Sequence, residues 1–239
     1  MVNKLTCAFC DQPGKRSKEH AIPQWISDLK PQNVRLRTEG QHVGVKEWVT
    51  VTDKIQIITR AFCVECNTGW MSKLEDSAKP NLLQLIGGSE ISLSAGTQAT
   101  ISSWAVKTAM VMEFTSASSK RLYFTPQERK QFSKNLQTPG NTFVFLASYV
   151  GPHFVWADEH CRTINAGGTT FPGYFATMVL GKLVLQIFSH RGHSGIRWSH
   201  GQDFSSAEIQ VWPAVTNTIW PPEEVLDQTG LEQYALRWQ

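Results

Sequence analysis

The sequence predicts an α+β fold, and three observations support this prediction. Two Cys-x-x-Cys pairs, Cys7/Cys10 and Cys63/Cys66, mark a small cross-linked module in the first part of the chain. Between the pairs, residues 34–38 and 47–60 alternate polar and apolar side chains, as half-buried strands do. After the second pair, helical and strand-like patterns are mixed. We therefore expect a cysteine-rich module with a β insertion, followed by a domain of helices and antiparallel strands.

The two pairs contain four of the five cysteines, and four thiolates in two pairs suit one tetrahedral Zn²⁺. A disulfide framework is the alternative, but such frameworks are typical of short secreted chains. This chain has 239 residues and no hydrophobic signal region after Met1. We expect Cys7, Cys10, Cys63 and Cys66 to hold a structural zinc, and Cys161 to be an ordinary buried thiol.

Zinc binding by both pairs would bring Glu19-His20 near Asn67, which directly follows the last of the four cysteines. A carboxylate and a carboxamide oxygen suit a hard divalent cation, and an imidazole can accept a proton from water near neutral pH. Each residue also has an ordinary structural explanation. A Glu-His pair in a polar stretch is usually a solvated loop or a cap, and Asn67 would be a favoured N-cap for a helix expected over residues 67–79.

The order Cys-x-x-Cys, Glu19-His20, Cys-x-x-Cys-Asn67 resembles the HNH, or ββα-metal, endonucleases, and within them the zinc-bound subgroup typified by phage endonuclease VII. The run from Glu19 to Pro23 is similar to the family's Asp/Glu-His-x-x-Pro motif. The resemblance implies an N-terminal zinc-stapled ββα-metal module. In that module Glu19 and Asn67 would hold a catalytic Mg²⁺ or Mn²⁺, and His20 would be the general base.

The activity implied by this resemblance is metal-dependent hydrolysis of DNA phosphodiester bonds. Two departures from the family pattern stand out: Glu19 occupies a position where Asp is more common, and the stretch between His20 and Cys63 is longer than in compact members. The resemblance covers residues 1–80, which we expect to form the zinc-binding HNH-like nuclease module. Residues 81–239 would form an α+β domain for substrate selection, partner binding or oligomerisation.

Helix and strand signals within the second domain are specific enough to place its elements. A Pro and a Gly-Gly pair at residues 80 and 87–88 mark the expected boundary. The Thr125-Pro126-Gln127-Glu128 run is a capping box with Pro at the first helical position. We expect helices over residues 98–114 and 125–136, strands over 142–150 and 153–156, and a hairpin over 174–188 that turns at Gly181-Lys182.

The net charge is only +3, but all of the excess lies in the first part of the chain. Residues 1–79 contain 12 Lys and Arg against 9 Asp and Glu, whereas the remainder contains 11 of each. This indicates weak, salt-dependent contacts to DNA phosphates. The candidates are Lys15, Arg16, Lys18, Arg35 and Arg37, although solvated surface charge is the better explanation for any single one of them.

Several expectations concern partners and compartment. The chain has no apolar run long enough to span a membrane, which together with the absent signal region predicts a cytoplasmic protein with no membrane partner. A homodimer is expected if both DNA strands are cut, and a protein partner is a further option. Among the contexts in which the family acts, phage defence or restriction is our preference.

Two alternatives stay open from the sequence alone. The module could be a catalytically silent, zinc-stabilised nucleic-acid-binding or assembly domain in which Glu19-His20 no longer cut. A rival metal or phosphate site could also form at His190, His193 and His200, although Ser, Gly and His at that density are typical of a turn.

Overall fold

The structure is a computed structural model that describes residues 5–31, 36–42, 45–52, 54–55, 57–115, 122–166, 168–192, 204–214 and 216–237. It is a mixed α+β protein with a half-barrel sheet and a cysteine cluster near the N-terminus. The chain forms two compact units. The cysteine unit contains Met1–Leu74 and Lys107–Gln137, and the sheet unit contains Glu75–Val106 and Thr138–Gln239.

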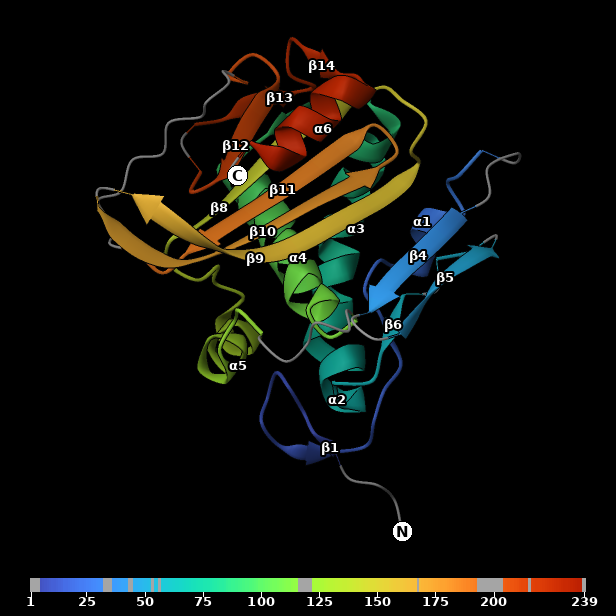
Figure 1. Cartoon of the computed structure of the whole chain (residues 1–239), viewed down its shortest axis with the longest axis vertical. Coiled ribbons are helices and arrows are strands. Elements are labelled where there is room, and N and C mark those ends of the chain that lie inside the picture. Colours follow the sequence, from blue (N-terminus) through green and yellow to red (C-terminus); the bar gives the residue numbers. More distant parts are fainter. Residues whose placement is uncertain are drawn as a thin grey trace. The chain divides into compact units, whose positions relative to one another are not determined.

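The cysteine unit is built from very short elements, labelled in Figure 1. Its strands form three separate antiparallel pairs, β1 with β2, β3 with β6 and β4 with β5. The elements are β1 (Leu5–Thr6), β2 (Pro13–Gly14), β3 (Glu19–His20), α1 (Gln24–Ser27), β4 (Leu36–His42), β5 (Val45–Thr52), β6 (Ile58–Thr59), α2 (Val64–Cys66), η1 (Asn67–Met71) and α5 (Pro126–Asn135).

The expected β insertion is present as the hairpin of β4 and β5, but residues 47–60 do not form one strand. The ladder of β5 ends at Thr52, and the N–H of Ile55 donates instead to Ser27 Oγ at 2.9 Å. The chain then returns as β6, which pairs with β3. The turn away from the hairpin therefore supplies a second strand for the Glu19-His20 segment.

The helix after the second cysteine pair begins earlier than the sequence suggested. Cys63, not Asn67, is its N-cap, because the Cys63 sulfur accepts the backbone N–H of Cys66. The N-cap interpretation of Asn67 is therefore wrong, and this residue has helical dihedral angles (φ −63°, ψ −53°). Gly69 then breaks the regular helix with φ −93° and ψ −109°, which a residue without a Cβ adopts most easily.

The same helix also ends later than expected. Helix α3 (Ser72–Gly87) runs through Pro80 and stops only at the glycine pair. Gly88 has φ +74°, and the N–H of Ser89 donates to the carbonyl of Gln84 at 2.9 Å, which is the bonding of a Schellman C-cap. Because this cap satisfies the last carbonyls, the glycine pair is the stronger stop signal here.

The sheet unit contains the longer elements of the chain. Its sheet has the order β12-β8-β11-β10-β9, and β14 adds to β8 as a parallel strand. Together these strands form the curved half-barrel in Figure 1. The elements are β7 (Ile91–Leu93), α4 (Ala95–Met112), β8 (Thr142–Tyr149), β9 (Val155–Ala166), β10 (Thr169–Leu180), β11 (Leu183–His190), β12 (Glu208–Trp212), β13 (Thr218–Trp220), β14 (Val225–Leu226) and α6 (Gln228–Leu236). Helix α4 belongs to this unit only up to Val106, and its last turns, from Lys107 on, belong to the cysteine unit.

Hydrophobic burial organises this unit. Every residue of β11 is buried, which a strand covered on both faces requires. Helix α6 covers one face, where Gln186 of β11 donates to the carbonyl of Tyr234 (Figure 1). Helix α4 contacts the sheet through Ser102, whose hydroxyl donates to the carbonyl of Val211.

Several elements expected after residue 80 are confirmed. Helix α5 has the complete capping box between Thr125 and Glu128, and the β10–β11 hairpin turns at Gly181-Lys182. Strand β9 differs, because it extends to Ala166 whereas the sequence suggested only residues 153–156. Strand β9 is the last strand in the sheet order, and edge strands often contain charged side chains. Its polar residues, among them Asp158 and Glu159, therefore obscured the strand pattern in the sequence.

Within the described residues, no helix is both long enough and apolar enough to cross a lipid bilayer.

Candidate metal centre

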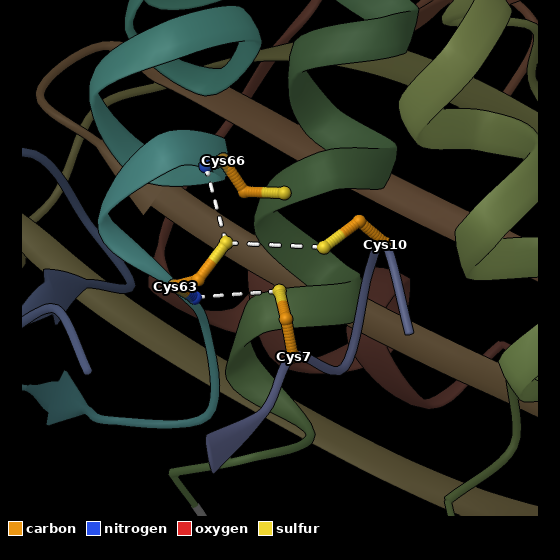
Figure 2. A group of neighbouring side chains, drawn as sticks. All are labelled: Cys7, Cys10, Cys63 and Cys66. Atoms are coloured by element: carbon orange, nitrogen blue, oxygen red, sulfur yellow. Dashed lines mark hydrogen bonds between the residues drawn. The ribbon is translucent and has the colours of Figure 1, made fainter. Parts of the chain in front are cut away.

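The four cysteines of the two Cys-x-x-Cys pairs converge on one point. Cys7 and Cys10 come from the turn between β1 and β2, and Cys63 and Cys66 come from the start of α2. Figure 2 shows the four side chains directed toward one another from these two segments. All four sulfurs lie within 4.8 Å of one another, so the expected convergence is confirmed.

The spacing of the sulfurs fits a tetrahedral zinc and does not fit a disulfide. Zn–S bonds of about 2.3 Å give a sulfur–sulfur distance of about 3.8 Å along each tetrahedron edge. The Sγ atoms of Cys10 and Cys63 are 3.8 Å apart, and a disulfide would need about 2.05 Å. Among the described residues, this cluster is the one group of three or more His, Cys, Asp or Glu side chains that is close enough to hold a metal.

Hydrogen bonds around the sulfurs favour thiolates. The backbone N–H of Cys63 donates to Cys7 Sγ at 3.3 Å, and that of Cys66 donates to Cys63 Sγ at 3.4 Å (Figure 2). The Cys66 thiol donates to Cys7, which lowers the pKa of Cys7 to about 4 and raises the pKa of Cys66. Burial raises the pKa of Cys63 to about 12. The Cys7 thiolate therefore forms easily, whereas the thiolates of Cys63 and Cys66 need the charge of a bound cation.

Close backbone approach brings the two knuckles together. The N–H of Val64 donates to the carbonyl of Lys15, and the N–H of Ser17 donates to the carbonyl of Phe62. Gly14 lies so near Cys63 that a Cβ on Gly14 would be 2.7 Å from the Cys63 Cβ. Only glycine fits at position 14 without a shift of the backbone, a requirement that the Cys-x-x-Cys pattern alone does not reveal.

An aromatic cluster supports the knuckles from within the cysteine unit. Phe9 lies between the first two cysteines, and Phe62 directly precedes the third. These two rings stack with centroids 4.8 Å apart, and Trp70 packs edge-on against Phe9 at the same distance. The cluster is completed by Phe114 and Phe132. Such rings make large apolar contacts, so the knuckles rest on a small core of their own.

Arg129 of α5 is a supporting residue that the sequence analysis missed. It is buried, and its Nε donates to the carbonyl of Ala8, inside the first knuckle, at 3.0 Å. Its guanidinium also donates to the carbonyl of Phe124 and lies over the ring of Phe114. Burial lowers the pKa of Arg129. Because 121 residues separate Arg129 from Ala8, no local pattern could have revealed this contact.

Strand β3 directs Glu19 and His20 to opposite sides. Residues opposite each other in an antiparallel pair share a face, and neighbours along a strand do not. Glu19 pairs with the buried Thr59, whereas the half-buried His20 pairs with the exposed Ile58. The carboxylate therefore faces the interior of the cysteine unit, and the imidazole is on the more open side.

The carboxylate of Glu19 already has a cationic neighbour. Nζ of Lys107, on α4, lies 3.6 Å from Glu19 Oε1. The Lys107 side chain is 0% exposed and that of Glu19 is 10% exposed. An ion pair this deeply buried loses hydration on both sides, so each charge depends strongly on the other. This neighbour was not foreseen, since Lys107 is far from Glu19 in the sequence and lies in a largely buried helix.

Asn67 lies against the segment that leads into β3. Its Nδ2 donates to Ser17 Oγ, and to the carbonyl of Lys18 at 3.1 Å. A carbonyl can only accept, which identifies the nitrogen of the amide and directs the Asn67 Oδ1 elsewhere. Asn67 therefore joins the start of the helical segment to the peptide next to Glu19.

The remaining candidates fall into two groups. Lys15, Arg16 and Lys18 are exposed and lie close before Glu19, whereas Arg35 and the side chain of Arg37 lie outside the described part of the structure.

Within the rival site, His190 is 3% exposed and its ring lies among the rings of Phe143, Phe171 and Phe188. Burial lowers the pKa of His190. His193 and His200 lie outside the described residues.

Comparison with known proteins adds no relative: no family model matches the chain, and neither does any curated protein or solved structure. Four cysteines form a candidate centre that suits zinc, and the Glu19-His20 strand and Asn67 belong to the same unit of the chain.

Proposed function

We propose that the protein is a metal-dependent endonuclease of the HNH type that hydrolyses DNA phosphodiester bonds. The observation that carries this proposal is the contact between Asn67 and the peptide next to Glu19. The two residues are far apart in sequence, and one cysteine pair precedes each of them, so a metal shared by the two pairs would hold them near each other. Further support comes from the order of elements, because the strand that carries Glu19-His20 is followed later in the chain by its partner strand β6 and then by the helical segment that contains Asn67.

His20 is the general base in this proposal. It is half-buried on the open side of β3, so a water molecule and a phosphate can approach it. An imidazole in its neutral form can accept a proton from water. Glu19 and the Oδ1 of Asn67 are the proposed ligands of a Mg²⁺ or Mn²⁺ ion. Such an ion supplies positive charge for the phosphoryl oxygens and the leaving group.

The zinc centre has a structural role in this scheme. All four of its ligands come from the protein, and closed tetrahedral sites are structural because they leave no position for substrate. The exposed Lys15, Arg16 and Lys18 are the proposed phosphate contacts. A homodimer would bring two such sites to the two strands of a duplex. Phage defence or restriction is the context that we propose.

The decisive experiment compares His20→Ala with the wild-type protein at equal zinc content. Supercoiled plasmid is incubated with each protein in Mg²⁺ or Mn²⁺, and nicking is followed by gel electrophoresis. Loss of a general base should slow nicking by about 100-fold to 10,000-fold. His153→Ala, a half-buried histidine in the sheet unit, is the matched control and should nick like the wild type. If His20→Ala nicks as fast as the wild type, or if the wild type cuts neither DNA nor RNA, the catalytic role of His20 is wrong.

The second candidate function is a zinc-stabilised nucleic-acid-binding or assembly module without catalysis. The buried Lys107 favours it, because an ammonium already balances the Glu19 carboxylate. In this case the wild type would bind DNA in gel-shift assays and release it as salt rises, with no nicking in any divalent cation. Replacement of Lys15, Arg16 and Lys18 by Gln would weaken that binding, whereas His20→Ala would not.

A further inference from the structure

Helix α4 contains one lysine, Lys107, in its buried part. Residues 101–113 of the chain are all buried, and Lys107 is a fully buried side chain among them. An ammonium is costly to bury unless an opposite charge and hydrogen bonds replace its water. The opposite charge is the carboxylate of Glu19, 3.6 Å away in the same unit.

The carboxylate of Glu19 has the same need. It faces inward beside Thr59, and its side chain is only 10% exposed, so solvent screens it little. Any cation that binds Glu19 must therefore share the carboxylate with the Lys107 ammonium or displace it. At a separation of a few ångströms in a poorly screened site, a monovalent and a divalent cation repel each other strongly.

We infer that Lys107 is a positioning residue that sets the affinity of the Glu19 site for divalent cations. This inference rests on the proposed function, because it takes Glu19 to be a metal ligand. The Lys107 ammonium balances Glu19 when no divalent cation is bound and keeps the affinity for that cation low. Removal of the positive charge at position 107 then strengthens cation binding, although Lys107 itself ligates nothing.

The test measures Mn²⁺ binding to zinc-loaded protein by calorimetry and by electron paramagnetic resonance. Lys107→Gln removes the charge but leaves an uncharged amide, so position 107 keeps a polar group that can donate hydrogen bonds. We expect this variant to bind Mn²⁺ about tenfold more tightly, or better. Lys107→Arg keeps the charge and should retain the weak affinity of the wild type. Adding Glu19→Gln to Lys107→Gln should cancel the gain.

A matched control is available in the same unit. Lys130 pairs with Asp11 at 3.5 Å, but both side chains are solvent-exposed, at 40% and 60%. Solvent screens that pair, so Lys130→Gln should leave the Mn²⁺ affinity unchanged. A gain in this variant as large as that in Lys107→Gln would show a general effect of net charge and would overturn the inference.

The outcomes separate this inference from the proposed function. If Glu19→Gln weakens Mn²⁺ binding while Lys107→Gln leaves it unchanged, Glu19 is a ligand and the role of Lys107 is wrong. If the gain persists in the double variant, the cation binds elsewhere and the inference also fails. If no variant binds Mn²⁺, both the inference and the cation site are wrong, whereas the nicking assay with His20→Ala tests the catalytic base separately.

Folding of the variant provides a second readout. Should Lys107→Gln fail to fold in a metal-free buffer, the inference requires Mn²⁺ to restore its fold, because the dication then replaces the missing charge beside Glu19. Sodium ions at the same ionic strength should not restore it. A variant that stays unfolded in Mn²⁺ would overturn the inference.

Discussion

Different interactions stabilise each of the two units of the chain. In the cysteine unit, β1, β2, β3 and β6 have two residues each, and strand pairs of that length are not stable on their own. In the sheet unit, β8 to β11 have 8 to 12 residues each and enclose a continuous apolar core. The unit with the least regular structure therefore contains the four clustered cysteines and the candidate catalytic residues. A metal bound by these cysteines would stabilise the cysteine unit in the way that strand pairing stabilises the sheet.

Removal of zinc should have the largest effect, and it should be confined to the cysteine unit. Structural zinc in small modules contributes about 10–16 kcal/mol at neutral pH, which exceeds the stability of a typical domain. We expect a strong chelator, or Cys63→Ser, to abolish amide protection in residues 5–31 and 57–71 while β10 and β11 stay protected. Hydrogen exchange followed by mass spectrometry measures both regions in one experiment. Simultaneous loss of protection in both regions would show that they depend on the same metal.

The reverse perturbation should act mainly on the sheet unit. Leu185 is fully buried in β11, and truncation of a buried leucine costs about 2–5 kcal/mol through lost burial and a cavity. Leu185→Ala should therefore lower the midpoint of denaturant unfolding of the sheet, while zinc content measured by metal analysis stays at one ion per chain. Loss of zinc from folded Leu185→Ala would contradict separate stabilisation of the two units.

A smaller change at the metal centre should show how tightly the knuckles are packed. A methyl group at position 14 would meet the Cys63 Cβ at 2.7 Å, and overpacking of this kind costs about 1–3 kcal/mol. We expect Gly14→Ala to bind zinc about tenfold or more weakly in competition with a chromogenic chelator. Gly140→Ala is a suitable control, because a Cβ at Gly140 would meet nothing within 4 Å. Equal zinc affinity in the two variants would mean that the knuckle has room to shift.

The difference between the units also explains which features the sequence revealed. The cysteine cluster could be predicted because the spacing within each pair is local and four thiolates have one common use. The α5 capping box and the β10–β11 hairpin could be predicted for the same reason, since Thr125, Glu128 and Gly181 act within a few residues of themselves. Interactions between residues that are close in the sequence can therefore be predicted from the sequence.

Features that depend on distant contacts were missed. Arg129 supports the first knuckle and Lys107 neutralises Glu19, yet neither residue lies near its partner in the sequence. In the sequence, Lys107 only interrupts an apolar segment. The N-cap of the helix is Cys63 because its sulfur accepts the backbone N–H of Cys66, the kind of bond that an Asn side chain makes at an N-cap. Which residue caps this helix is therefore decided by the tertiary structure.

Acid provides the mildest test of the comparison, because it should weaken the two units through different groups. In the sheet unit, burial lowers the pKa of His190, so the folded protein resists protonation more than the unfolded chain does. The unfolded state therefore binds more protons once the pH falls below about 6.5, and stability is lost from there down to the folded pKa. The slope of that loss cannot exceed about 1.4 kcal/mol per pH unit for one histidine.

His190→Phe should remove this pH dependence while keeping an aromatic ring beside Phe143 and Phe188. It also removes the Nδ1 acceptor of the Gly192 N–H, which costs stability equally at all pH values. Amide protection in β10 and β11, measured at pH 7.5 and 5.5, isolates the sheet unit from acid release of zinc. If wild-type protection falls no more than that of His190→Phe, another group controls the acid sensitivity of the sheet. The argument that burial alone keeps His190 neutral would then be wrong.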